Sequence, residues 1–245
     1  MRAGTEAFIT RETDRRDRLN LVWHPQRGKP AILADYSSAT EATQCIADPD
    51  MLIGGANITS ATSAAAVEGG IFLAVVAGTT NAVALSPHTL ANNSPWEQVT
   101  WGTEQEVEWE ALLQIDAVLT DRFFHAGLML LPATVDTSTD DDQVKFWAQD
   151  DGALDVLVSI ATADTTVAGF RTVLASQLVH LAIKFDPNGL AHFYCDGQEV
   201  GHPNAYFRGN AVDLHPGVGT LEDTSGAADP KINVLGMAIS RAIGA

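Results

Sequence analysis

Residues 178–201 read LVHLAIKFDPNGLAHFYCDGQEVG, two runs of alternating apolar residues on either side of Asp-Pro-Asn-Gly. Pro187 presets φ for the second position of a turn, and Gly189 accepts the positive φ that closes a type I turn with a bulge. This stretch therefore predicts a β-hairpin in which Asp186 pairs with Leu190.

The register that follows from this turn separates an apolar face from a mixed one. The apolar face pairs Phe185 with Ala191, Ile183 with Phe193 and Leu181 with Cys195. The mixed face pairs Lys184 with His192, Ala182 with Tyr194 and His180 with Asp196. A slip of one residue would exchange the faces of one strand relative to the other, so turn and alternation favour the same register. The hairpin is predicted to form part of a two-layer core.

The rest of the chain repeats this pattern of short apolar runs separated by turns that contain Gly, Asp and Asn. Strands are expected near residues 71–78, 81–86, 106–119, 123–131, 143–149, 153–161, 171–176, 178–185, 190–196 and 232–240. No long amphipathic helix and no internal repeat is visible. The predicted fold class is all-β, an antiparallel β-sandwich.

The chain of 245 residues carries a formal net charge of −17 that is unevenly distributed. Residues 1–29 hold seven of the 14 Lys and Arg residues against four acidic ones, so a basic segment precedes an acidic body. Such a body could not neutralise a run of phosphates, which argues against nucleic-acid binding. The longest apolar run, residues 71–77, is too short to cross a membrane. Cys45 and Cys195 match no metal or redox motif and are expected to be reduced packing residues.

We expect three parts along the chain: an extended basic arm over residues 1–30, a linking segment over 31–63 and the sandwich domain over 64–245. Arginine forms bidentate pairs with carboxylates, so an arginine-rich arm is suited to an acidic partner. The residues expected to bind that partner are Arg11, Arg15, Arg16, Arg18, Leu19, Leu21 and Trp23.

Three segments together resemble a known fold family. WEALLQIDAVLTDRFFHAGL (109–128), VKFWAQDDGALDVLV (144–158) and the hairpin, with Phe193, Tyr194 and Asp196-Gly197, are similar in order to the concanavalin A-like jelly roll of laminin-G and lectin/glucanase domains. The resemblance covers about residues 65–245. With GGIFLAVVAGTTNAVALSP (69–87) ahead of them, the segments resemble jelly rolls in virion proteins of tailed bacteriophages. This fold hosts lectins, hydrolases and structural modules, so it does not by itself define an activity.

Glu106, Glu108 and Glu110 are the sharpest candidates for catalysis. Strand alternation would place all three on one face, with Val107 and Trp109 on the other, and the glucanases of the resembled fold use a row of carboxylates in this way. The first and third Glu would lie roughly 13 Å apart at ~3.3 Å per residue. The alternative is a polar face that meets solvent or a neighbouring subunit.

Two further groups of residues are candidate binding sites. Asp136, Asp140, Asp141 and Asp142 could supply oxygen ligands to calcium, but they lack the glycine and closing glutamate of an EF-hand loop, so a solvated acidic loop is favoured. Trp96, Trp101, Trp109 and Trp147 could stack on sugars, but large aromatic residues more often belong to a core or an interface. No cofactor and no metal are therefore expected, with calcium as the alternative.

These observations favour a structural virion protein without enzymatic activity, a capsid decoration or cement protein on the capsid surface, made in the host cytoplasm. Its expected partners are copies of itself, first as a trimer and second as a dimer, and the major capsid protein. A carbohydrate-binding adhesin module of a head or tail fibre, recognising a surface glycan, is the alternative. A glycoside hydrolase is the third interpretation.

Overall fold

The computed structural model describes residues 18–23, 44–46, 51–54, 61–65, 71–75, 82–87, 99, 101–115, 122–130, 142–148, 153–174, 176–207, 212–222 and 231–243. They contain 16 β-strands, and no residue in these ranges is helical. Consequently, the described part of the chain holds no helix that is long and apolar enough to span a membrane.

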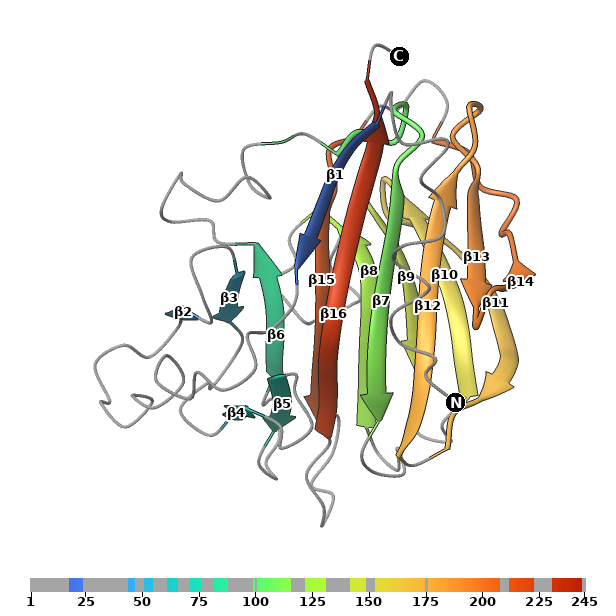
Figure 1. The fold of residues 1–245 in the computed structure, drawn as a ribbon. Helices are drawn as coiled ribbons and strands as arrows, with labels where there is room; N and C mark the ends of the chain where they lie inside the picture. The colour runs from blue at the N-terminus through green and yellow to red at the C-terminus, as the bar shows by residue number, and fades with distance from the viewer. Residues whose placement is uncertain are drawn as a thin grey trace.

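The strands form two antiparallel sheets, which we name sheet A and sheet B. Sheet A consists, in spatial order, of β14 (Gln198–Gly201), β13 (Ala191–Cys195), β12 (Gln177–Phe185), β7 (Glu108–Ile115), β16 (Lys231–Ala242), β5 (Ile71–Val75) and β4 (Ala61–Ala65), with β1 (Arg18–Trp23) also paired to β16. Sheet B consists of β11 (Ala163–Thr172), β10 (Ala153–Ile160), β9 (Gln143–Ala148), β8 (Arg122–Met129), β15 (His215–Glu222), β6 (Ala82–Pro87), β3 (Met51–Gly54) and β2 (Gln44–Ile46). In Figure 1, strands β16, β7 and β12 of sheet A lie in front of β15, β8 and β9 of sheet B.

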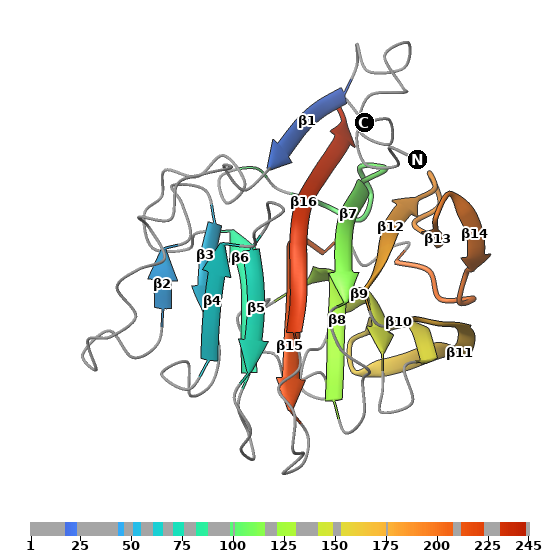
Figure 2. The same cartoon turned by 60° about the horizontal axis from the view of Figure 1, so that its bottom comes forward.

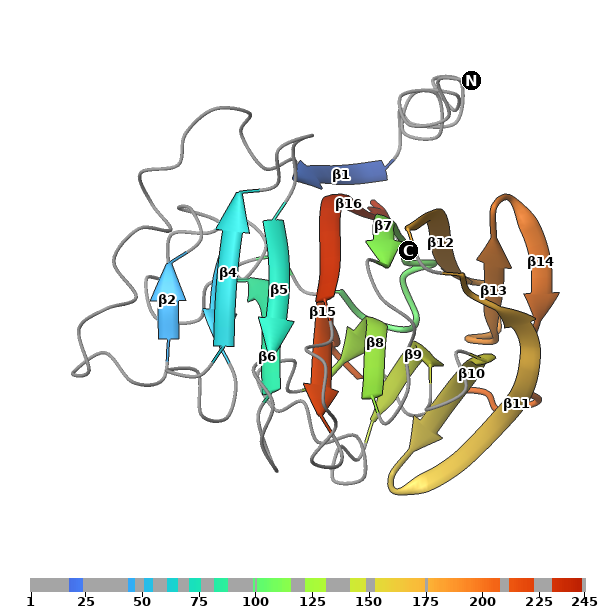
Figure 3. The same cartoon turned by 90° about the horizontal axis from the view of Figure 1, so that it is seen from below.

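The core fills the space between the two sheets, which Figure 3 shows as two layers seen from below. Alternate residues of each strand point into it, as in β7, where Trp109 and Leu113 are fully buried. Phe146 of sheet B meets Phe193 of sheet A edge to face, with ring centroids 5.2 Å apart. Cys195, two residues after Phe193 on β13, is a buried free thiol. The predicted all-β antiparallel sandwich is confirmed.

The hairpin of β12 and β13 has the predicted register. Phe185 pairs with Ala191 and Lys184 with His192, and the pairing continues to Leu181 with Cys195. At the turn, the Gly189 N–H donates to the Asp186 carbonyl, and Gly189 has φ 78°. Burial alone would raise the pKa of Asp186, but its carboxylate accepts the N–H groups of Leu190 and Asn188, and these bonds lower the pKa overall. The turn therefore holds an ionised aspartate.

The segment expected to be an extended arm that reaches a partner contributes a strand to sheet A of its own chain. Arg18–Trp23 pairs with the C-terminal half of β16, from Arg18 opposite Ala242 to Trp23 opposite Met237, and β5 pairs with the other half of the same edge. Figure 2 shows β1 and β5 in succession along β16. Leu21 packs against the core because it lies opposite the buried Ile239. The sandwich thus includes strands upstream of residue 64, so removal of residues 1–23 would take away part of a sheet.

Four strands of sheet B differ from the sequence-based expectations: β2 and β3 lie in the segment expected to be a linker, and β11 and β15 differ as follows. A strand was expected over residues 171–176, whereas β11 runs from Ala163 to Thr172 and follows a turn at Ala161 and Thr162, whose φ values are 48° and 71°. Neither turn residue is the Gly, Asn or Asp that normally marks positive φ. β15 was missed because its Pro and Gly residues weaken the strand signal. Gly219 is required there, since a Cβ would lie 2.6 Å from Cε1 of His125.

Candidate functional site on the outer face of sheet A

The outer face of sheet A, which we call face A, consists of the side chains that point away from the core. Its described members include Arg18, Asn20, Val22, Glu108, Glu110, Leu112, Gln114, Leu178, His180, Ala182, Lys184, His192, Tyr194, Glu199, Ala238 and Ser240. Backbone pairing between strands that are distant in sequence brings these residues together.

One row of face A crosses five strands with Glu110 near its centre. Val22 pairs with Ala238, Ala238 with Glu110, Glu110 with Ala182, and Ala182 with Tyr194. The two alanines on either side of Glu110 have short side chains and are at most 8% exposed. The longer side chains of Glu110 and Tyr194 therefore project beyond them. We call this row the track: it has a carboxylate, Glu110, at its centre and an aromatic residue, Tyr194, two strands away.

Three carboxylates of face A each pair with a cationic or titratable side chain. Glu110 Oε2 lies 3.0 Å from His180 Nε2, Glu108 Oε2 lies 3.5 Å from Lys184 Nζ, and Glu199 Oε1 lies 2.8 Å from His192 Nδ1; all six side chains are 20–41% exposed. Lys184 Nζ also lies 5.6 Å from the ring centroid of Tyr194. Face A is thus a network of half-exposed pairs that solvent and ligands can reach.

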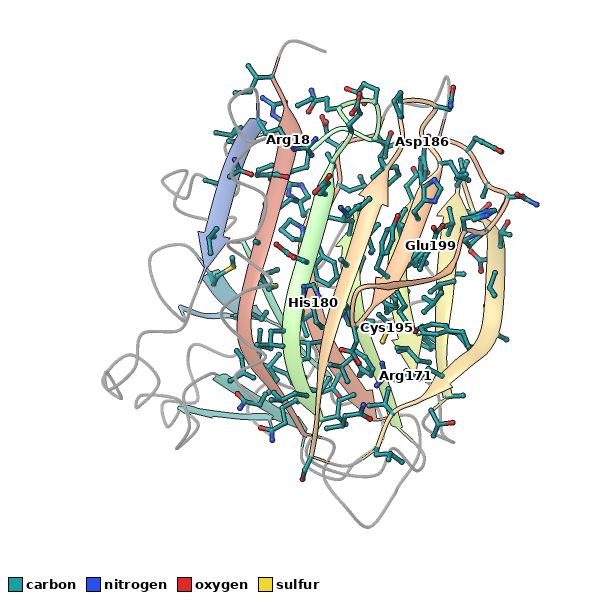
Figure 4. All side chains as sticks on the ribbon, turned by 45° about the vertical axis from the view of Figure 1, so that its right-hand side comes forward. Arg18, Arg171, His180, Asp186, Cys195 and Glu199 are labelled. Carbon is teal, nitrogen blue, oxygen red and sulfur yellow. The ribbon has the colours of Figure 1, made fainter. Side chains whose placement is uncertain are left out.

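The backbone of His180 is hydrogen-bonded to Asp196, which lies in the turn between β13 and β14. The Asp196 N–H donates to the His180 carbonyl at 2.8 Å, and the His180 N–H donates to Asp196 Oδ1 at 3.0 Å. The other carboxylate oxygen, Asp196 Oδ2, accepts Arg171 Nη1 at 2.5 Å, and Arg171 belongs to β11 of sheet B. Figure 4 shows Arg171 and Cys195 below His180 at this side of the molecule. A chain of contacts therefore ties the His180–Glu110 pair to the edge of the other sheet.

An imidazole oriented by a carboxylate is an arrangement suited to proton transfer. An ionised carboxylate only accepts hydrogen bonds, so the contact with Glu110 places the Nε2 proton of His180 on the side of Glu110. A histidine fixed in this way can act as a general acid or base when a substrate hydroxyl or C–H lies within reach.

The structure brings together two of the three predicted glutamates. Val107 and Trp109 are fully buried, and Glu108 and Glu110 face outward, as alternation predicted. Glu106 precedes β7 and has φ 48°, a left-handed backbone that interrupts the alternation, and its carbonyl accepts Arg18 Nη2 at 2.5 Å. The expected row of three carboxylates is therefore a pair, whose Cα atoms are about 7 Å apart at ~3.3 Å per residue.

The predicted calcium loop lies mostly outside the described residues, which include Asp142 but not Asp136, Asp140 or Asp141. Asp142 Oδ1 accepts the Ala161 N–H at 3.1 Å and so caps the turn before β11. Among the residues that the structure describes, no three His, Cys, Asp or Glu side chains gather in a way that could hold a metal ion.

The predicted partner-binding residues fall into two groups. Arg11, Arg15 and Arg16 lie outside the described residues. Leu19, Leu21 and Trp23 belong to β1. The Arg18 guanidinium donates through Nε to Ser240 Oγ at 3.2 Å, and through Nη2 to the Glu106 carbonyl. Arg18, at the upper left of Figure 4, thus bonds within its own chain.

The four tryptophans considered as sugar-stacking residues lie in different environments. Trp101 and Trp109 are core residues with 1% and 0% exposure, so neither can stack on a sugar. Trp147 is half-buried on the outer side of sheet B, and Lys145 Nζ lies 5.0 Å from its ring centroid. Trp96 lies outside the described residues.

The outer side of sheet B, which we call face B, contrasts with face A because most of its described side chains are buried. Its described members include Ala84, Ser86, His125, Gly127, Met129, Gln143, Lys145, Trp147, Asp155, Leu157, Ser159, Gly217 and Gly219, with Asp164 and Thr166 exposed at the β11 edge. His125 and Lys145 are each 1% exposed. Burial, followed by the charge of Lys145, lowers the pKa of His125 to about 3, so the ring is neutral at neutral pH.

Sequence reasoning identified two of the three carboxylates of face A, Glu108 and Glu110, but missed Glu199 and the partners of all three as site residues. His180, Lys184 and Tyr194 had been placed on the mixed face of the hairpin, and that placement is confirmed. The pairing of β7 with β12, which sets Glu110 beside Ala182 and Glu108 beside Lys184, had no local signal. An excess of polar residues on one hairpin face was the available clue.

Comparison with known proteins shows the fold and no closer relationship. No family model matches the sequence, and no curated protein matches it. Similar solved structures include alginate lyase A1-II' of polysaccharide lyase family 7 (15% identity, 74% of this chain and 83% of that chain, TM-score 0.55) and the carbohydrate recognition domain of Emp47p (9% identity, 80% and 90%, TM-score 0.56). A protein of unknown function from Shewanella oneidensis MR-1 is also similar (10% identity, 92% and 87%, TM-score 0.57).

These structures define the class of the protein as a concanavalin A-like jelly-roll sandwich, as the order of its segments had indicated. They also contradict the expectation that the chain is not an enzyme. Alginate lyase A1-II' shares the fold and has been solved in complex with its substrate, at 13% identity and a TM-score of 0.51. Because that enzyme is so different in sequence, the lack of a familiar catalytic motif here was no argument against activity.

Proposed function

We propose that the chain is a carbohydrate-active protein that binds a polysaccharide across face A. The observation that carries this proposal is the track of Glu110, Ala182 and Tyr194, in which Glu110 and Tyr194 are half-exposed on either side of the buried Ala182, on a sheet whose other face is the core. Sugar rings suit such a track because they combine apolar C–H faces with many hydroxyl groups. The two similar structures named for carbohydrate processing or recognition support the proposal at the level of the fold.

We further propose that the His180–Glu110 pair is the centre at which a bound chain is cleaved. The contact of 3.0 Å orients the imidazole, and Glu108 and Tyr194 supply a second carboxylate and a phenol on the same face. Cα atoms about 7 Å apart allow two carboxyl groups to approach the separations used in glycoside hydrolysis. Elimination would instead need a base that removes a proton from a sugar carbon.

The test is binding and turnover on a panel of polysaccharides. We expect Glu110→Gln and Tyr194→Ala each to bind the polysaccharide about tenfold or more weakly than wild type, since each removes a group from the track. Glu104→Gln is the matched control, because Glu104 is an exposed carboxylate outside the strands of sheet A. New reducing ends without ultraviolet absorbance indicate hydrolysis, whereas absorbing unsaturated ends indicate elimination. Unchanged binding in both track variants would contradict the proposal.

The virion decoration role, with its trimer or dimer and its capsid partner, stays a prediction that no comparison and no described contact tests. Its basis was the basic arm, the acidic body and the lack of a coherent catalytic set, and Arg18–Trp23 of that arm pairs within the same chain. Occupancy of the protein on purified particles is the measurement that would support it.

A further inference from the structure

The described part of face A carries more carboxylates than cations. Apart from its two imidazoles, it holds three carboxylates, Glu108, Glu110 and Glu199, against two cations, Arg18 and Lys184. His180 pairs with Glu110 and His192 with Glu199. Lys184 lies beside Glu108 and Tyr194, and Arg18 donates to Ser240 and to the Glu106 carbonyl. Carboxylate oxygens remain available. Only Oε2 of Glu110 and Oε1 of Glu199 take part in these pairs, so Glu110 Oε1 and Glu199 Oε2 are open acceptors among the described contacts.

We infer that the polysaccharide bound on face A carries no anionic groups. The inference rests on the proposed function and names the class of its ligand. Open carboxylate oxygens bind ligands that donate hydrogen bonds, and bonds between hydroxyl groups and a carboxylate are short and strong because the acceptor is charged. A sugar hydroxyl meets this requirement, whereas the carboxylate of a uronic acid would face Glu110 and Glu199 without a donor between them.

Recognition of a polyanion would require cations that are not already neutralised. Lys184 is the central lysine of face A, and Glu108 at 3.5 Å satisfies much of its charge. Breaking such a pair to bind a ligand carboxylate would exchange one ion pair for another and leave Glu108 next to the ligand's charge. The site therefore discriminates against polyuronates by like-charge repulsion.

The charge of the whole chain acts in the same direction. A net charge of −17 repels a polyanion before contact, over a screening length of about 8 Å at physiological ionic strength. Approach of an uncharged polysaccharide is unaffected by this field. The ligand class thus differs from the polyuronate that the name of alginate lyase A1-II' implies for that protein.

The experiment compares the wild-type chain on uncharged glucans, mannans and xylans with the polyuronates alginate and polygalacturonate, at low and physiological salt. We expect binding to at least one uncharged polysaccharide with a Kd that changes less than twofold with salt, and polyuronate binding at least tenfold weaker. The variant Glu108→Gln frees Lys184 and should strengthen polyuronate binding about tenfold at low salt. Glu104→Gln makes the same change in net charge away from face A and should strengthen it by less than twofold.

The outcomes separate this inference from the proposed function. Polyuronate binding equal to or tighter than that of every uncharged glycan would overturn the inference and leave the function standing. An equal gain in Glu108→Gln and Glu104→Gln would also overturn it, since net charge rather than the Lys184 pair would then set the preference. Absence of binding to any glycan would overturn both.

Discussion

Faces A and B have similar side chains but opposite environments. Each has a titratable residue in the middle of a row that crosses the sheet: Glu110 between Ala238 and Ala182 on face A, and His125 between Gly219 and Trp147 on face B. Glu110 has a side chain that is 25% exposed and a histidine partner, whereas His125 is 1% exposed. Polar groups on face A can therefore serve a ligand, while those on face B affect the free energy of unfolding.

The state of His125 makes the contrast measurable. In the described part of the chain neither ring nitrogen of His125 has a hydrogen-bond partner. Burial lowers the pKa of His125 most, and the charge of Lys145 lowers it further. The difference between the faces teaches that residue type does not define a site; access to solvent and the presence of a partner do.

The largest expected effect is the pH dependence of stability from His125. Its pKa is lowered to about 3 in the folded chain from an ordinary value of 6.5, so the unfolded chain binds a proton that the folded chain excludes between these values. The stabilisation is complete above pH 6.5 and is lost as the pH falls toward 3, at about 1.4 kcal/mol per pH unit. Denaturant unfolding of wild type and His125→Asn at several pH values in this window measures the difference.

Carboxylates also titrate in this range, so only the difference between the two slopes is diagnostic. We expect His125→Asn to be less stable at pH 7 but shallower in its pH dependence. Parallel slopes for the two proteins would show that His125 is protonated, and hence hydrated, in the folded state. Face B would then resemble face A.

A smaller effect is expected from Gly219→Ala on face B. The added Cβ would lie 2.6 Å from Cε1 of His125 and 2.8 Å from the Val83 carbonyl oxygen, and the backbone oxygen cannot move aside easily. We expect a loss of about 1–3 kcal/mol, as for other overpacked sites. Ala182→Ser on face A, where the neighbours are half-exposed, is the matched control and should change stability by about 0.5 kcal/mol or less. Similar losses in both would remove the contrast.

The smallest effect is expected from the Glu108–Lys184 pair on face A. The two side chains are 35% and 22% exposed, so solvent screens their attraction. A double-mutant cycle with Glu108→Gln and Lys184→Met should give a coupling of about 0.2–1 kcal/mol that decreases with added salt. A salt-insensitive coupling above about 2 kcal/mol would mean that face A is organised for stability rather than for binding.

What the sequence determined was local. The turn Asp186-Pro187-Asn188-Gly189 and the alternation around it defined the hairpin register, because turn geometry and the period of two act within a few residues. The same alternation placed Glu108 and Glu110 outward and Trp109 inward. Fold class followed from repetition of these signals along the chain.

Tertiary structure alone decided which of these strands lie side by side. β7 meets β12 about 70 residues away and β16 about 125 residues away, and β1 joins β16 from the other end of the chain. No turn links these strands, so their register depends on how the whole core packs. Glu110 gained His180, and His125 lost its contact with solvent, for that reason: the partners and the burial that give a polar side chain its chemistry come from packing between distant segments.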